Sequence, residues 1–294
     1  MDWDKLRIFH AAAEAGSFTH AGDALHMSQS AVSRQVSALE RELKVSLFHR
    51  HARGLQLTEQ GDLLYRTAAD VMAKLQTTEM LLTDTRDKPE GEVRISAPVG
   101  LGTVWVTQRL REFMELYPDI RIDLVLSDGQ VDLSMREADV GIWLHEPSHT
   151  DLIRRQLATM KVRAYASPAY IRRYGAPQTV ADLDRHRLLG YSGPPQLSAD
   201  LSWLETVGRG GKPPRVPAMK ANSVVALKYA VRAGIGIGLI PDYMTEEADL
   251  VSVLPDADQP TLPILFVYPE ELKSSKRIQV LREFLVTQAR QWKY

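Results

Sequence analysis

Residues 16–36, GSFTHAGDALHMSQSAVSRQV, decide the fold of the N-terminal part of the chain. Gly16 is expected to end a first helix over residues 4–15, because glycine readily adopts the left-handed conformation that terminates helices. The hydroxyl of Ser17 can accept a hydrogen bond from the exposed amides of a new first turn, which is how serine caps a helix. The segment therefore predicts a second, short helix that begins after Ser17 and ends near Leu25.

A third helix is expected after a short break at residues 26–27. Ser28 can cap this helix, which covers residues 29–43 and carries one apolar stripe, at Val32, Val36, Leu39 and Leu43. The buried face of the first helix is expected to carry Leu6, Phe9, His10 and Ala13. A short helix, a brief turn and a second helix form the helix-turn-helix arrangement, whose second helix can enter the major groove of DNA. Its exposed face carries short polar side chains and one cation, at Gln29, Ser30, Ser33 and Arg34.

The same stretch, taken with two later segments, resembles the signature of the LysR-type transcriptional regulators. The later segments are LFHR at residues 47–50 and LTEQG at residues 57–61, which match the family's wing and the start of its linker helix. Gly22 departs from the family's usual alanine, at a cost of about 1 kcal/mol in a helix. The resemblance implies a winged helix-turn-helix domain over residues 1–60, with DNA contacts from Ser28, Gln29, Ser30, Ser33, Arg34, Arg50 and Arg53. Taken singly, a serine or glutamine here is better explained as a solvated surface residue, and only the joint motif favours DNA contact.

Charge and composition limit the classes of function. The formal net charge is −1, and residues 1–60 hold seven basic and seven acidic side chains, so DNA binding depends on where the cations lie. The chain has no cysteine, which excludes disulfides and cysteine-ligated metals. It shows neither a secretory signal nor a run of about 20 apolar residues, so we expect a cytoplasmic protein with no membrane partner.

A long linker helix is expected over residues 58–88, ahead of a break at residues 88–91 that contains Pro89 and Gly91. Apolar or small side chains recur along it at intervals of four and three residues, the spacing of a coiled-coil seam, at Leu64, Ala68, Val71, Leu75, Thr78 and Leu82. Such a stripe predicts homodimerisation, which would place two recognition helices on one duplex. The alternative is that the helix packs on its own domain.

From Glu92 onward, β-like segments alternate with amphipathic ones, which favours βαβ units and a largely parallel sheet. We expect a helix over residues 102–116, strands at 120–126 and 139–143, and a surface excursion over the Gly- and Pro-rich residues 193–217. Residues 91–294 resemble the family's effector-binding domain, an α/β fold like that of periplasmic binding proteins. The resemblance implies two subdomains, I at about 91–162 and 267–294 and II at about 163–266, with a final helix from Ser275 to about Trp292 packed on subdomain I.

The cleft between these subdomains is expected to bind a small-molecule effector, because open α/β sheets bind ligands at the carboxyl ends of their strands. From subdomain I, the resemblance places there Ser96, Ala97, Pro98, Val99, Ser127, Asp128, Trp143 and Leu144. From subdomain II, it places there Tyr191, Ser192, Asn222 and Ser223. Helix N-termini and hydroxyls suit a carboxylate, whereas Trp143, where many relatives carry arginine, makes the site less cationic. Each residue taken singly fits an ordinary loop or core role as well.

Two other classes of function compete with regulation. An enzyme would need a catalytic constellation, but the His-Glu-x-x-His and G-x-S-x-G motifs are absent, and the glycines of residues 233–241 indicate tight packing rather than a dinucleotide loop. A solute-binding transport component would need an export signal. The sequence therefore predicts a non-enzymatic transcription regulator without metal or cofactor. It is expected to bind promoter DNA as a homodimer or homotetramer, with RNA polymerase as a further partner.

Overall fold

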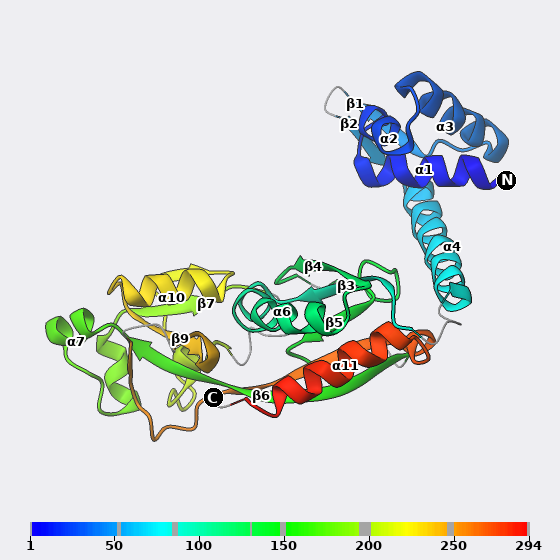
Figure 1. Cartoon of the computed structure of the whole chain (residues 1–294). Coiled ribbons are helices and arrows are strands. Elements are labelled where there is room, and N and C mark those ends of the chain that lie inside the picture. The colour runs from blue at the N-terminus through cyan, green and yellow to red at the C-terminus, as the bar shows by residue number, and fades with distance from the viewer. Residues whose placement is uncertain are drawn as a thin grey trace. The chain divides into compact units, whose positions relative to one another are not determined.

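The computed structural model describes residues 2–51, 54–83, 88–129, 131–147, 151–193, 201–245 and 250–292. The chain divides into two compact units, Met1–Met80 and Leu81–Tyr294. Figure 1 shows helices and a small hairpin in the first unit and a mixed sheet with flanking helices in the second. No helix among the described residues is both long and apolar enough to cross a membrane.

The first unit opens with three helices: α1 (Trp3–Ala15), α2 (Phe18–Leu25) and α3 (Gln29–Leu43). Gly16 follows α1 with φ of 59°, a left-handed conformation that costs glycine little. The Ser17 hydroxyl accepts a hydrogen bond from the Thr19 amide at 3.2 Å, and the Ser28 hydroxyl accepts one from the Ala31 amide at 3.2 Å. Both predicted caps and the helix-turn-helix order are therefore confirmed.

The core of this unit lies between the three helices. The predicted stripe of α3 is confirmed, with Val32, Val36 and Leu39 fully buried and Leu43 packed against them. On α1 the prediction was too narrow. Leu6 and Phe9 are buried and His10 and Ala13 are half-buried, as the sequence implied, but the buried set also includes Ile8 and Ala12. The buried face of α1 is wider because it packs on α2, on α3 and on the hairpin.

Gly22 has a packing role that its helix propensity does not reveal. A Cβ built on Gly22 would lie 2.6 Å from the carbonyl oxygen of Met27, in the turn between α2 and α3. The Met27 amide donates to the Gly22 carbonyl at 2.9 Å, which holds this turn closed. An alanine here would therefore require the turn to shift, and the glycine allows α2 and the turn to approach closely.

The hairpin consists of β1 (Phe48–His51) and β2 (Gly54–Leu57), paired antiparallel with Phe48 opposite Leu57. It is fixed to the helices at two places. The Leu55 amide donates to the Gly16 carbonyl at 3.0 Å. The Glu40 carboxylate of α3 accepts hydrogen bonds from the amides of Leu47 at 2.8 Å and Phe48 at 3.3 Å. The hairpin is the wing that the sequence predicted.

Helix α4 (Glu59–Thr83) begins at a cap made by Thr58. The Thr58 hydroxyl accepts from the Gly61 amide at 3.0 Å and donates to the Ser46 carbonyl at 2.7 Å. The apolar stripe predicted along α4 has one part packed on the core and another part exposed to solvent. Its first members, Leu64 and Ala68, pack against the core of the first unit, because the early turns of α4 lie on that core. Further along, the exposed members are Val71, Leu75 and Thr78, while the side chain of Leu82 lies outside the described residues.

The second unit contains one mixed sheet with the strand order β4-β3-β5-β11-β6-β9-β7-β8, and β10 pairs with β6. The strands are β3 (Gly91–Ala97), β4 (Ile120–Leu126), β5 (Val140–Trp143), β6 (Leu152–Ala166), β7 (Leu188–Tyr191), β8 (Met219–Ala221), β9 (Ile237–Pro241), β10 (Val251–Ser252) and β11 (Thr261–Pro269). Strands β4, β3 and β5 are parallel at one end of this order, and β9, β7 and β8 are parallel at the other. The α/β fold expected for this region is confirmed.

Strands β6 and β11 connect the two halves of the sheet. They pair antiparallel with each other from Lys161 opposite Thr261 to Leu152 opposite Pro269. Beyond that ladder, β6 pairs with β9 from Val162 onward. Within it, residues 265–267 of β11 also pair with β5 on their other side. A register shift between Ile264 and Leu265 marks the change. The subdomain boundaries expected after residue 162 and before residue 267 fall on these two strands.

The helices found among the described residues of the second unit are α5 (Val99–Leu101), the π-helical turn η1 (Gly102–Val106), α6 (Thr107–Leu116), α7 (Pro168–Tyr174), η2 (Val180–Arg185), α9 (Trp203–Thr206), α10 (Val224–Arg232), η3 (Asp242–Met244), η4 (Glu270–Leu272) and α11 (Lys276–Ala289). Helix α11 lies beside β6 and packs on α6 (Figure 1), with the ring centroids of Phe284 and Phe113 separated by 5.3 Å. The final helix therefore packs on the first half of the sheet, as predicted.

Two expectations about this unit need correction. The helix expected over residues 102–116 begins at Val99, because the extended Pro98 can precede a helix and α5 continues directly into η1 and α6. The segment 193–217 is not wholly a surface excursion. It contains α9 with a buried Leu204, and the buried Arg215 guanidinium donates to the carbonyl of Val207 at 2.8 Å and contacts the Asp184 carboxylate at 2.6 Å.

The glycines of residues 233–241 are packing residues, as the sequence indicated. Gly234 adopts φ of 76° after α10. A Cβ built on Gly236 would lie 2.4 Å from the Arg187 carbonyl oxygen, and one on Gly238 would lie 2.8 Å from the Val231 side chain. These close approaches let β9 lie against β7 and α10.

Candidate DNA-reading surface and effector cavity

The exposed face of α3 carries the side chains expected to read DNA. Gln29, Ser30 and Arg34 are exposed and Ser33 is half-buried, whereas the opposite face of the helix fills the core. Ser28 is committed to the cap of α3, and its hydroxyl also lies 3.1 Å from the Ser30 hydroxyl. The face therefore offers short hydrogen-bonding groups and one guanidinium, which can reach base edges and phosphates in a major groove.

The structure describes only part of the wing. Its backbone is described at β1, which includes Arg50, and at β2, but the side chain of Arg50 and the whole of Arg53 lie outside the described residues. The Glu40 carboxylate of α3 accepts from the backbone that enters β1. The recognition helix and the wing are therefore joined by hydrogen bonds within one unit.

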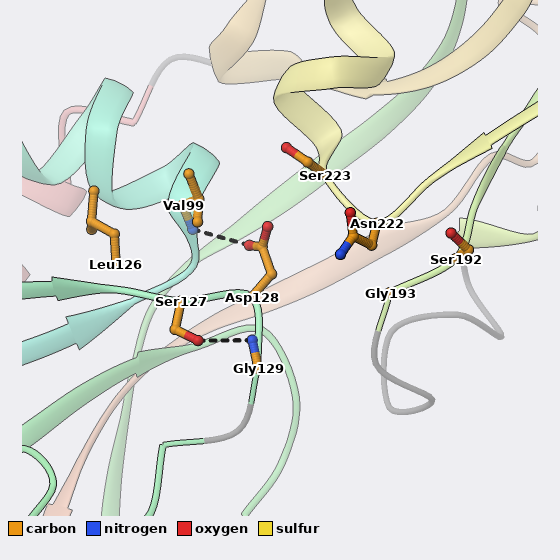
Figure 2. Close-up of a pocket in the computed structure, with 9 residues that line it drawn as sticks. All are labelled: Val99, Leu126, Ser127, Asp128, Gly129, Ser192, Gly193, Asn222 and Ser223. Carbon is orange, nitrogen blue, oxygen red and sulfur yellow. Dashed lines mark hydrogen bonds between the residues drawn. The ribbon is translucent and has the colours of Figure 1, made fainter. Parts of the chain in front are cut away.

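A cavity of about 530 Å³ lies in the second unit (Figure 2). The described residues that line it are Val99, Leu126, Ser127, Asp128, Gly129, Ser192, Gly193, Asn222 and Ser223. Val99 starts the helix after β3, and residues 126–129 end β4 and follow it. Residues 192–193 follow β7, and residues 222–223 join β8 to α10. All of them lie at the carboxyl ends of parallel strands, where open α/β sheets bind ligands.

Hydrogen bonds fix the loop that follows β4. The Asp128 carboxylate accepts from the Val99 amide at 3.0 Å, and the Ser127 hydroxyl accepts from the Gly129 amide at 3.0 Å (Figure 2). On the opposite wall, the Ser223 hydroxyl caps α10 by accepting from the Ala226 amide at 3.5 Å. These bonds orient the loop before any ligand arrives.

Asp128 dominates the electrostatics of the cavity. Burial raises the pKa of its carboxyl, and the hydrogen bond from the Val99 amide partly offsets this. Burial together with the nearby Asp128 raises the pKa of Tyr191 to about 12. Burial also raises the pKa of Tyr243, with Asp128 and Asp242 as further causes. Two protonated phenols therefore lie within electrostatic range of this carboxylate.

The two walls of the cavity approach each other at Gly100. A Cβ built there would lie 2.9 Å from the Val224 side chain of α10 and 3.0 Å from the Tyr243 hydroxyl. Residue 100 belongs to the wall after β3, and residues 224 and 243 belong to the half of the sheet that contains β9. The absence of a side chain at this position therefore sets how closely the walls can meet.

The structure brings together half of the residues assigned to the cleft from sequence. Six of the expected residues line the cavity: Val99, Ser127, Asp128, Ser192, Asn222 and Ser223. The others do not line it. Ser96 and Ala97 are buried within β3, half-buried Pro98 precedes the helix, and Tyr191 is buried at the end of β7.

Trp143 is not among the described residues that line this cavity. Its indole packs against a cluster that contains Leu133, Leu152 and Val267, and it stacks on His145 with 5.3 Å between the ring centroids. The adjacent Leu144 is buried and does not line the cavity either. The indole turns to this cluster because an apolar surface is available beside β5 and β11. It therefore lies away from the cavity.

Three cavity residues were missed from sequence: Leu126, Gly129 and Gly193. Each is adjacent to a residue that was named, so their position at a strand end was the available signal. Glycines contribute backbone rather than side-chain atoms, and no side-chain chemistry could have singled them out.

Comparisons with known proteins agree with this arrangement. Residues 3–62 match the family of bacterial regulatory helix-turn-helix proteins of the lysR family, and residues 86–290 match the LysR substrate binding domain. The HTH-type transcriptional regulator CrgA of Neisseria meningitidis is 30% identical over 288 residues, which cover 96% of this chain and 95% of CrgA. The HTH-type transcriptional activator TtdR of Escherichia coli is 29% identical over 295 residues, which cover 97% and 93%.

Solved structures give the same result. The full-length Vibrio cholerae virulence activator AphB is similar with a TM-score of 0.65 and 28% identity, covering 98% of this chain and 99% of AphB. The structure of CrgA from Neisseria meningitidis is similar with a TM-score of 0.63 and 29% identity, with the same coverage. The helix-turn-helix unit, the α/β unit with its cavity and these full-length similarities lead to one conclusion. The chain belongs to the LysR family of DNA-binding transcription regulators, with an N-terminal helix-turn-helix domain and a C-terminal effector-binding domain.

Proposed function

We propose that the chain reads promoter DNA through Gln29, Ser30, Ser33 and Arg34 of α3, with Arg50 and Arg53 of the wing on adjacent phosphates or in the minor groove. The observation that carries the proposal is the two-faced character of α3, whose apolar stripe is fully buried while its polar face is exposed. Bases are read by such short polar side chains and by arginine, and phosphates by arginine.

The proposed assembly is a homodimer formed through the exposed part of α4. Val71 and Leu75 are 39% and 47% exposed, and both continue the stripe that begins in the core. Pairing of two such stripes would place two copies of α3 at half-sites about 34 Å apart. The second units would join dimers into a tetramer, and a regulator of bacterial promoters would act in the cytoplasm alongside RNA polymerase.

The cavity of the second unit is proposed to bind the effector rather than to catalyse a reaction. Its described lining contributes hydroxyls, one amide, one carboxylate and two apolar side chains from both walls. A ligand that contacts both walls binds the closed form more tightly than the open form, and it thereby shifts the equilibrium between them. The shift between open and closed forms would alter the geometry of the assembly and thereby its binding to DNA.

The test is affinity capture of fragmented genomic DNA by the wild-type chain and by Arg34→Ala, followed by sequencing. We expect enrichment at dyad-symmetric promoter sites with the wild type and its loss with Arg34→Ala. Arg111→Ala is the matched control, because it removes an equally charged and exposed side chain from the second unit. Equal enrichment with Arg34→Ala and the wild type would contradict the proposed role of α3.

A further inference from the structure

Two backbone amides on the wall that follows β3 and β4, where an anion could bind, are already occupied. An anionic ligand at a helix start or tight loop is held by free N–H groups. Here the Val99 amide donates to the Asp128 carboxylate at 3.0 Å, and the Gly129 amide donates to the Ser127 hydroxyl at 3.0 Å (Figure 2). The protein thus supplies its own anion where a carboxylate ligand would have been expected.

The charge of the cavity lining is negative, which is the sign that a ligand carboxylate would carry. Asp128 is the ionisable side chain among the described lining residues, and no cationic side chain of the described residues forms an ion pair with it. One of its oxygens accepts from the Val99 amide, and the other accepts no hydrogen bond from the part of the chain that the structure describes. A ligand carboxylate would have to approach this oxygen as a like charge, whereas a cation would gain an opposite charge in a half-buried setting.

The other polar groups of the lining can accept a hydrogen bond from a donor ligand, although each can also donate one. The Asn222 side chain points toward Asp128 across the cavity in Figure 2, and its amide oxygen can accept an N–H. The hydroxyls of Ser192 and Ser223 can accept as well. Val99 and Leu126 add apolar surface that can cover a short hydrocarbon body.

We infer that the effector cavity takes a small protonated amine whose ammonium group pairs with Asp128, and not the carboxylate that helix termini and hydroxyls suggested from sequence. The inference rests on the proposed function of the cavity as the effector site. An ammonium offers three N–H donors, which match the second Asp128 oxygen, the Asn222 amide oxygen and a serine hydroxyl.

The test uses three probes of the same length, butylamine, butyramide and butyrate, with dissociation constants measured by ligand-observed NMR on the full chain at low salt. Butylammonium is expected to bind the wild type at least tenfold more tightly than butyrate, which is about 1.4 kcal/mol. Butyramide should fall between them. Tighter or equal binding of butyrate, or no binding of butylammonium, would overturn the inference without recourse to any variant.

Two variants test whether butylammonium binding depends on the charge of Asp128. Asp128→Asn keeps an acceptor for the Val99 amide and removes the charge, and it should weaken butylammonium binding at least tenfold. Asp119→Asn removes the same charge from an exposed residue before β4, at the opposite end of that strand, and should leave binding unchanged. Butylammonium binding that does not respond to Asp128→Asn would overturn the inference.

DNA affinity measured with each probe separates this inference from the proposed function. If butyrate binds at Asp128 and changes DNA affinity, the cavity is an effector site and the inferred ligand class is wrong. If butylammonium binds there and neither it nor any other cavity ligand changes DNA affinity, the ligand class holds and the regulatory role of the cavity fails.

Discussion

Replacement of Val71 and Leu75 by alanine should weaken self-association of the chain roughly hundredfold. Full burial of such a side chain stabilises by about 1.5–3 kcal/mol. Because Leu75 is 47% exposed and Val71 is 39% exposed, covering the exposed part of each contributes about 1 kcal/mol. The two side chains occur twice in a dimer, and alanine retains its Cβ, so the loss is about 3 kcal/mol. That corresponds to about two powers of ten in the dissociation constant.

Analytical ultracentrifugation over a concentration series measures this loss directly. Alanine has a higher helix propensity than leucine or valine, so the substitutions should leave α4 helical. Leu63→Ala is the matched control. Leu63 is 69% exposed on the same helix, but it precedes Leu64 by one residue and therefore lies about 100° from the stripe.

At concentrations above the wild-type dissociation constant and below that of the double variant, the assembly mass of the double variant should move toward half that of the wild type. This holds whether the wild type is a dimer or a tetramer joined through the second units. A dissociation constant equal to that of the wild type, or a wild type that is monomeric at micromolar concentration, would refute the assignment of this stripe to the dimer interface.

Three further outcomes are expected. Glu40→Ala leaves the amides of Leu47 and Phe48 without their acceptor and should lower the free energy of unfolding by about 1–3 kcal/mol in chemical denaturation, whereas Glu40→Gln should lose less. Burial raises the pKa of Asp242, so the folded chain holds this proton more tightly than the unfolded chain. The unfolding free energy of the wild type relative to Asp242→Asn should therefore fall as pH rises above 3.8, and a pH-independent difference would contradict this. Arg34→Ala should make the salt dependence of DNA binding shallower by about 0.9 for each phosphate that the guanidinium neutralises, measured by fluorescence anisotropy, and an unchanged slope would show that Arg34 neutralises none.

The first unit could be predicted closely because local rules determine it. The hydroxyls of Ser17 and Ser28 satisfy amides within three residues of themselves, and such bonds depend on contiguous sequence alone. The stripe of α3 follows from helical periodicity. Helix propensity gives Gly22 only a cost, because it does not include the contact that a Cβ there would make with Met27 in the following turn.

Only half of the residues expected at the cleft line the cavity, for a different physical reason. Side chains alternate between faces along a strand, so knowledge of where a strand ends does not fix which of its last residues points into the cleft. Ser96 and Ala97 point to opposite faces of β3 and are both buried, whereas Val99, at the start of the following helix, lines the cavity. Trp143 turns to an apolar cluster that is assembled from residues distant in sequence, including Leu133 and Val267. No local pattern encodes that competition.

The position of Gly100 indicates how ligand binding can be converted into a change of state. A Cβ at this position would lie 2.9 Å from the Val224 side chain, so the observed arrangement requires glycine or a small displacement of one wall. Asp128 belongs to one wall and Asn222 to the other, and a ligand held by both gains its full set of contacts only when the walls meet. A ligand with tenfold preference for the closed form shifts the equilibrium by about 1.4 kcal/mol. Linkage is reciprocal, so DNA that favours the closed form must raise ligand affinity by the same factor that the ligand raises DNA affinity. If DNA favours the closed form, a bulkier side chain at residue 100 should hold the walls apart and reduce both affinities together.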